Sequence, residues 1–293
     1  KFSDIWLNAK QGTDAAVAMA FGHVILREFH LDRQAEYFED YVRRYSDMPM
    51  LVELEAKGES YVPGRQLRAA DFDGGLGQAN NPEWKTVAFD EASGKVVVPN
   101  GSIGFRWGEH GNWNLEQKAE GSEVKLRLSH ILEEDRDAVV GVDFPYFGGV
   151  ASNGFEVCNH PEVLTRNVPV KKLTLANGRE TYVATVFDLF CANYSLDRGL
   201  GGAHVAKSYD ADVPFTPAWA EKITGVARDK IIHVAREFAS NAEKTNGKSM
   251  VIIGAAMNHW YHMDMNYRTV INMLVMCGCI GQSGGGWAHY VGQ

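Results

Sequence analysis

The order of segments near the end of the chain constrains its fold most strongly. Met250–Gly254 is apolar and predicts a buried strand. A polar aromatic loop at 258–262, an apolar helix and a glycine-rich loop at 284–286 follow it. This order is typical of open α/β folds, which bind ligands at the carboxyl edge of a parallel sheet. We therefore expect a nucleotide-binding cradle beside this strand.

A similar turn lies near the start of the chain. The apolar segment 4–7 predicts a strand, and Gly12-Thr13-Asp14 would begin a helix with Thr13 as its N-cap. Backbone amides at a helix start suit a phosphate, whereas a carboxylate suits a guanine edge or a ribose hydroxyl. A capped helix without any ligand fits the same residues. Two such turns in one chain suggest a large or paired nucleotide cofactor.

Composition narrows the class of protein. Of 293 residues, 45% are hydrophobic and 23% are charged, as in a soluble globular protein. The net charge of -8 disfavours a nucleic-acid groove. No apolar run is long enough to span a bilayer. The four cysteines form no CxxC pair, and we expect Cys277 and Cys279 to be buried thiols. The chain starts at Lys1 and stops just after a glycine-rich loop, so we expect an internal piece of a longer polypeptide.

The middle of the chain, from about residue 51 to 200, predicts a β-rich, loop-rich insertion. Its strongest signal is Asn177-Gly178, a hairpin turn between alternating segments at 172–175 and 181–186. Further strands are expected at 85–89, 95–98 and 125–128, with Trp84, Trp107 and Trp113 as packing anchors.

Helices are expected on both sides of this insertion. They cover residues from Asp14, then 33–45, a segment from Thr216 to Gly225, and about 228–241. We expect 1–246 to form part of one α/β nucleotide-binding domain that carries the insertion. Residues 247–293 would begin a second cofactor-binding segment.

The loop Asn258–His262 has three interpretations from its residues alone. His259 and His262 are spaced to share a helical face and hold a metal, they pack without a function, or they hydrogen-bond a polar cofactor. The chain has neither the Lys-Ser/Thr of a P-loop nor the spacing of a dinucleotide fingerprint, which disfavours ATP and NAD. It also has no GxSxG elbow, so hydrolase chemistry has no support.

Several segments resemble one known family. Residues 10–25, 216–239 and 249–293 are similar to matching segments of the molybdenum bis(molybdopterin guanine dinucleotide) oxidoreductases, the dimethyl sulfoxide reductase family. Residues 41–51, 80–89, 99–107 and 258–262 resemble the respiratory nitrate reductase branch of that family almost word for word. The resemblance covers the whole chain. It implies Rossmann-like parallel-sheet α/β domains of the molybdopterin oxidoreductase type, with the β-rich insertion.

The resemblance also implies a set of site residues. His259 and His262 are the catalytic candidates, close to the pterins or the molybdenum pocket. Cofactor contacts are implied for Gly12, Thr13, Asp14, Gly254, Met257, Asn258, Tyr261, Gly285, Gly286, Gly292 and Gln293. Tyr261 stands where related enzymes have Gln, which leaves its contact in doubt. The molybdenum-ligating Asp and the 4Fe-4S ligands are expected upstream, so no metal ligand is assigned here and the segment alone should not reduce nitrate.

The implied activity is the reduction of nitrate to nitrite by oxygen-atom transfer at molybdenum. The implied partners are an iron-sulfur beta subunit and a membrane cytochrome b gamma subunit, at the cytoplasmic face of the cell membrane. Nitrite oxidoreductase and chlorate or selenate reductase are the rival activities. A scaffold or interface segment with no direct catalytic role is the non-catalytic alternative.

Overall fold

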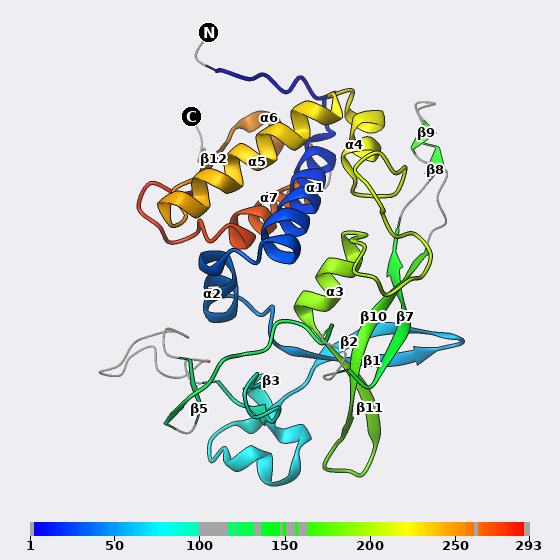
Figure 1. The fold of residues 1–293 in the computed structure, drawn as a ribbon, viewed down its shortest axis with the longest axis vertical. Helices are drawn as coiled ribbons and strands as arrows, with labels where there is room; N and C mark the ends of the chain where they lie inside the picture. The colour runs from blue at the N-terminus through cyan, green and yellow to red at the C-terminus, as the bar shows by residue number, and fades with distance from the viewer. Residues whose placement is uncertain are drawn as a thin grey trace.

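The computed structural model describes residues 3–99, 117–119, 121–131, 136–146, 149–150, 156–157, 163–260 and 263–289. It has a layer of helices with a small parallel sheet at one end and a mostly antiparallel β-barrel at the other (Figure 1). The mixed α/β class expected from the sequence is therefore confirmed.

The central helix of the helical layer is α1 (Asp14–Ile25), which contacts three other helices. These are α4 (Pro217–Thr224), α5 (Arg228–Thr245) and α7 (Met263–Met276). A small residue in α1 also allows a close contact with Tyr194. A Cβ on Gly22, in the middle of α1, would lie 2.5 Å from the ring of Tyr194. Close packing against that ring explains a glycine inside a helix, where it costs about 1 kcal/mol relative to alanine.

Most helix starts agree with the expected ones, and one differs, while the helix expected at about 228–241 continues to Thr245. Thr216 caps α4 by accepting a hydrogen bond from the amide of Trp219, and Gly225 ends the helix with φ +75°. The expected helix at 33–45 is wrong at its start. A π-helix, η1 (Leu26–Asp32), continues α1, and α2 covers Glu36–Tyr45. The chain breaks between them because Gln34 has a left-handed backbone, with φ +49°.

The parallel sheet contains β12 (Met250–Ile253) and β13 (Gly286–His289). The strand expected at Met250 is confirmed, but its burial is only partial. Ile253 is buried, whereas 76% of Ile252 is exposed because helices cover one face of this pair. The strand expected at 4–7 is wrong. That segment pairs with no strand of the described residues, and Lys10 donates its backbone amide to the carbonyl of Thr224 instead.

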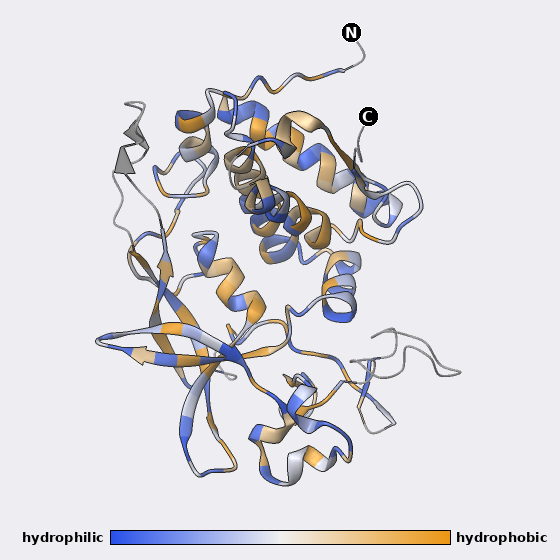
Figure 2. Ribbon diagram, turned by 180° about the vertical axis from the view of Figure 1, so that it is seen from behind, coloured by the Kyte–Doolittle hydropathy of each residue, from blue (hydrophilic) through white to orange (hydrophobic). Residues whose placement is uncertain are grey.

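The barrel closes in the order β1-β11-β10-β7-β2. Its strands are β1 (Leu51–Lys57), β2 (Ser60–Gln66), β7 (Ala138–Pro145), β10 (Val163–Thr174) and β11 (Glu180–Thr185). The hairpin at Asn177-Gly178 is confirmed, since β10 and β11 pair in antiparallel register from Lys171–Val183 to Thr174–Glu180. A parallel bridge between Tyr61 and Val142 closes the ring. In Figure 2 the strands alternate between hydrophobic and hydrophilic residues, whereas hydrophobic residues gather in the central helices.

Short elements decorate the barrel. They are η2 (Ala69–Asp71), η3 (Asp73–Gly77), η4 (Pro82–Trp84), β3 (Ala88–Phe89), β4 (Val96–Val97), β5 (Lys118–Ala119), β6 (Ser122–Glu123), β8 (Gly149–Val150) and β9 (Glu156–Val157). The segment 125–128 forms only an isolated bridge between Leu126 and Asp90. Trp84 is not a packing anchor, because 60% of it is exposed. Trp107 and Trp113 lie outside the described residues.

The barrel joins the helical layer through α3 (Val186–Asn193) and a buried arginine. The guanidinium of Arg166, on β10, donates to the carbonyls of Asn193 and His204 and to the hydroxyl of Ser195. Burial lowers the pKa of Arg166 to about 10. The expected domain boundary at residue 247 stays a prediction. One hydrophobic cluster includes residues from both sides of it, such as Leu26 and Leu274.

Candidate functional site

The turn before α1 has an open helix start. Gly12 takes φ +78°, which favours glycine, and Thr13 occupies the N-cap position as expected. The expected capping bond does not form: the backbone of Thr13 has φ -112° and ψ 11°, and its hydroxyl donates to the carbonyl of Lys10 at 2.6 Å. No side chain of the described residues caps the first turn of α1, and Asp14 is its first residue. Amides at this end are therefore available to a ligand acceptor.

A second turn follows β12. Gly254 precedes α6 (Ala255–Asn258), and a Cβ on Gly254 would meet nothing within 4 Å. His259 and Trp260 come directly after α6 and are exposed. Met257 is buried in the main hydrophobic cluster. This turn therefore offers open backbone and one exposed imidazole, and Met257 anchors it to the core.

The two turns meet in space. A Cβ on Gly12 would lie 3.2 Å from the indole ring of Trp260. An open pocket of about 390 Å³ lies at the junction, lined by Gln11, Ala255, Ala256, His259 and Trp260. Segments separated by more than two hundred residues of sequence thus form one small surface. This is the proximity that two cofactor-binding corners require.

The glycine-rich loop has a packing role of its own. A Cβ on Gly285 would overlap the carbonyl oxygen of Gly247, and Gly286 takes φ +89° with its amide bound to the carbonyl of Ser249 at 2.9 Å. Only Gly284 of the three faces open space, with nothing within 4 Å of its Cβ position. Close backbone packing therefore explains Gly285 without any ligand.

The remaining expected site residues are Asn258 and four residues outside the described ranges. The backbone of Asn258 ends α6. Tyr261, His262, Gly292 and Gln293 lie outside the described residues, so their contacts stay predictions. Within the described ranges, which omit His262, no group of three or more His, Cys, Asp or Glu side chains is placed to hold a metal ion. Cys277 and Cys279 are buried thiols, and burial raises the pKa of Cys279 to about 11.

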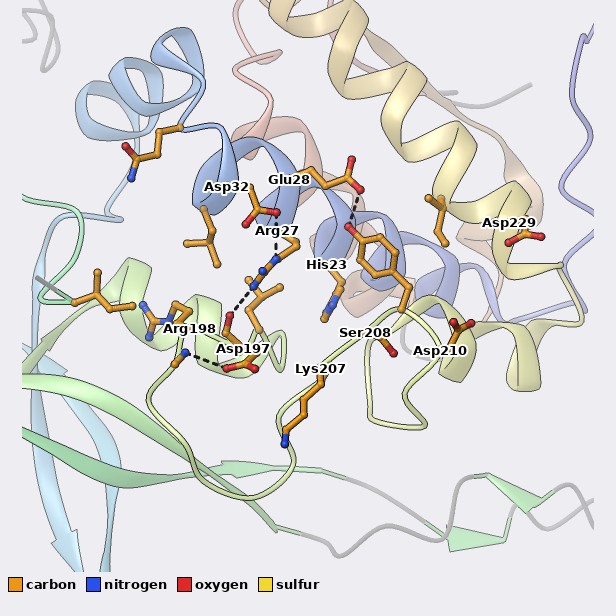
Figure 3. A pocket seen from close by; sticks show the side chains of 18 residues that line it. His23, Arg27, Glu28, Asp32, Asp197, Arg198, Lys207, Ser208, Asp210 and Asp229 are labelled. Carbon is orange, nitrogen blue, oxygen red and sulfur yellow. Dashed lines mark hydrogen bonds and ion pairs between the residues drawn. The ribbon is translucent and has the colours of Figure 1, made fainter.

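Sequence reasoning missed a second, larger pocket. It has a volume of about 880 Å³ and lies between the α1–η1 helix and the segments 196–199 and 206–210 (Figure 3). His23 of α1 reaches it, and burial lowers the pKa of this imidazole to about 4. Glu28 of η1 accepts hydrogen bonds from Tyr209, which also lines the pocket, and from Arg236 of α5. His23 stands in an apolar helical stripe, where a histidine gives no sequence signal that separates a site from a core position.

Comparisons with known proteins place the chain in a family. The sequence profile of the molybdopterin oxidoreductases matches residues 1–291. The chain therefore belongs to the molybdopterin oxidoreductase family, which implies a molybdenum-pterin cofactor.

Its relatives include named nitrate reductase subunits. The chain is 60% identical over 295 residues to the respiratory nitrate reductase 1 alpha chain of Escherichia coli K12. It is 43% identical to the nitrate reductase alpha chain of Bacillus subtilis and 27% identical to the perchlorate reductase alpha subunit of Dechloromonas aromatica. It spans 23% of the length of the Escherichia coli relative and of the Bacillus relative. No helix in the described ranges is long and apolar enough to cross a membrane.

Proposed function

We propose that the full protein containing this chain is the catalytic alpha subunit of a respiratory nitrate reductase. In this proposal the segment holds the guanine dinucleotide ends of two molybdopterins. The observation that carries it is the meeting of the Gly12 and Gly254 turns at one open pocket. The 60% identity to a respiratory nitrate reductase alpha chain, across the whole segment, supports the choice of substrate.

The residues at the junction fit such a cofactor. The uncapped start of α1 offers amide donors to a phosphate, and the Asp14 carboxylate accepts from a guanine edge or a ribose hydroxyl. The open space in front of Gly254 admits a ligand where a side chain would block it. When bound, the molybdenum group supplies the redox and oxygen-atom-transfer chemistry that converts nitrate to nitrite.

Each expected residue takes a defined part in this proposal. His259 and His262 donate hydrogen bonds to a pterin or to a substrate oxygen. The remaining contacts to the two guanine dinucleotides come from Gly12, Thr13, Asp14, Gly254, Met257, Asn258, Tyr261, Gly285, Gly286, Gly292 and Gln293. The chain's own task is to bind, orient and exclude water.

The proposal extends to the assembly. The 4Fe-4S cluster would be held by residues outside this segment and would deliver electrons from an iron-sulfur beta subunit. That subunit would receive them from a membrane cytochrome b gamma subunit. The location is then the cytoplasmic face of the cell membrane, with the alpha subunit bound peripherally.

The test uses the full-length protein in its complex. Molybdenum and guanine nucleotide are quantified after denaturation, and nitrite formation is measured with a reduced viologen dye. Loss of one hydrogen bond of about 1.4 kcal/mol predicts an approximately tenfold lower activity or cofactor content for His259→Ala. Gly254→Leu should lower cofactor content further, because its side chain would fill the open space. His233→Ala, on the exposed face of α5, is the matched control and should match the wild type.

Two results would reject the proposal. A complex that contains no molybdenum or guanine nucleotide would favour a scaffold role for the segment. A cofactor-loaded complex that turns over chlorate, selenate or perchlorate much faster than nitrate, or that mainly oxidises nitrite, would assign it to a sister activity.

A further inference from the structure

The indole of Trp260 lies at the junction of the two turns, and the proposed function gives it no part. The residue comes directly after α6, and 43% of it is exposed. Its carbonyl accepts the amide of Met263 at 3.2 Å, which ties its backbone to the start of α7. A large planar side chain is thus presented to solvent from a backbone that is held between two helices.

One face of this indole rests on Gly12. A Cβ at Gly12 would lie 3.2, 3.3 and 3.4 Å from Cε3, Cδ2 and Cζ3 of Trp260, three neighbouring atoms of the six-membered ring. An approach along the edge of the ring would leave one atom clearly nearer than the other two. The backbone of Gly12 therefore lies over a face of the ring, and a side chain at this position would push the indole away.

The remaining surface of the ring borders the open pocket of about 390 Å³. Gln11, Ala255, Ala256 and His259 form the rest of its lining. Among the described residues no ring stacks on Trp260, and neither its indole N–H nor the side-chain amide of Gln11 makes a hydrogen bond. The pocket therefore combines a free aromatic surface and two small apolar side chains with polar groups that have no partner.

This combination fits the base of a nucleotide. An indole stacks on a nucleobase because every base has a π-face. A glutamine amide both donates and accepts, so it can pair with the polar edge of a base. The uncapped start of α1, next to Gly12, offers amides to the phosphate of the same nucleotide.

We propose that Trp260 stacks on the guanine base of one cofactor nucleotide and that Gln11 hydrogen-bonds the edge of that base. Gly12 supports the opposite face of the indole and so keeps the ring in place. This inference rests on the proposed function and adds two positioning residues to it. Both residues act on nucleotide binding, so neither should change the rate of the reaction at a loaded molybdenum centre.

The test uses the full-length chain prepared without cofactor and measures binding by isothermal titration calorimetry. The probes are guanosine monophosphate and ribose 5-phosphate, which has the same phosphate and sugar but no base. The nucleotide should bind at least about fivefold more tightly. Equal affinities, or no binding of the nucleotide, would overturn the proposal. Neopterin is the third probe, and Trp260-dependent binding of neopterin instead of the nucleotide would assign the indole to a pterin ring.

Variants locate the base. Trp260→Leu should weaken binding of guanosine monophosphate about 5- to 100-fold and leave ribose 5-phosphate unchanged, whereas Trp260→Phe should restore most of the affinity. Gln11→Ala should weaken nucleotide binding about fivefold. The matched control is Trp84→Leu, because Trp84 is a tryptophan of η4 that is 60% exposed, and it should change nothing. Unchanged nucleotide affinity in Trp260→Leu would reject the stacking.

The assembled complex separates this inference from the proposed function. Trp260→Leu should lower the guanine nucleotide content per chain, while nitrite formation per bound molybdenum stays that of the wild type. A slower rate per molybdenum at full cofactor content would place Trp260 at the reacting centre and contradict the stacking. A wild-type complex without molybdenum and guanine nucleotide would reject the proposed function. A loaded wild type whose nucleotide content does not depend on Trp260 would reject only this inference.

Discussion

The barrel and the helical layer bury their apolar surfaces differently. The barrel closes its five main strands in a ring around a cluster that includes Val52, Val142 and Val168, and the bridge between Tyr61 and Val142 joins its two end strands. Among the described residues the helical layer has two parallel strands, and β12 exposes 46% of Met250 and 76% of Ile252. Parallel sheets are normally covered on both faces. The barrel therefore buries its apolar residues within its own ring. The helical layer, which carries the candidate cofactor site, leaves apolar surface exposed beside that site.

The two regions also differ in their buried polar groups. The barrel side buries the guanidinium of Arg166, which has three acceptors for its hydrogen bonds and keeps its charge. The helical layer buries the imidazoles of His23 and His30, and burial lowers the pKa of each to about 4. Both imidazoles are therefore neutral at pH 7. These two imidazoles therefore make the helical layer sensitive to acid.

Acidification should produce the largest effect. An unfolded histidine binds a proton below its ordinary pKa of about 6.5, whereas folded His23 and His30 remain neutral until about pH 4. Stability is therefore full above pH 6.5 and falls as the pH decreases through this window. Each histidine should lower the free energy of unfolding by about 3 kcal/mol at pH 4.5 relative to pH 7. Urea unfolding followed by circular dichroism at pH 7.0 and 4.5 measures the loss.

A variant isolates the histidine contribution. Carboxylates whose pKa is lowered in the folded protein, including Asp71 and Asp137, also lower the free energy of unfolding when they are protonated on acidification. His30→Phe keeps an aromatic ring against Phe38 but does not titrate. Its loss between pH 7.0 and 4.5 should be about 3 kcal/mol smaller than that of the wild type. An identical loss in both proteins would show that His30 is not held neutral.

Two glycines of the helical layer should separate packing from ligand binding. Gly285→Ala should destabilise the fold by about 3 kcal/mol, because the new Cβ meets the backbone of Gly247, which cannot turn aside. Gly254→Ala should cost less than about 1 kcal/mol, because its Cβ enters open space. Thermal unfolding of the two variants compares them directly. Similar losses at both positions would refute the distinction between a packed and an open glycine.

The sequence predicted local features well where one turn or cap decides them. Thr216 and Gly225 bound α4, and Asn177-Gly178 joins β10 to β11, because these residues act within a few positions of the chain. The prediction from sequence was wrong where contacts between distant segments decide strand pairing or burial. The segment 4–7 is apolar enough for a strand but has no neighbouring strand to pair with among the described residues. Ile252 is apolar, yet nothing in the described chain covers it.

The candidate site shows the same limit. The two glycine turns were recognisable as separate helix starts, but only the fold brings Gly12 against Trp260. The Thr13 hydroxyl was expected to cap α1, but it accepts no amide of the first turn and donates to the carbonyl of Lys10. The pocket at His23 gave no signal at all, since its walls come from α1, η1 and loops near residues 197 and 208.

The smallest effect is expected at the tip of the barrel hairpin. Gly178 takes φ +78°, and its Cβ position is empty, so Gly178→Ala introduces backbone strain without a clash. The strain should cost about 1 kcal/mol. Gly178→Asn should cost less, because asparagine tolerates the left-handed conformation better than alanine. Thermal unfolding should therefore give the highest midpoint for the wild type, a lower one for Gly178→Asn and the lowest for Gly178→Ala. Because the barrel closes on itself, cofactor content in the full-length protein should be unchanged in both variants, and a loss there would show that the barrel supports the cofactor site.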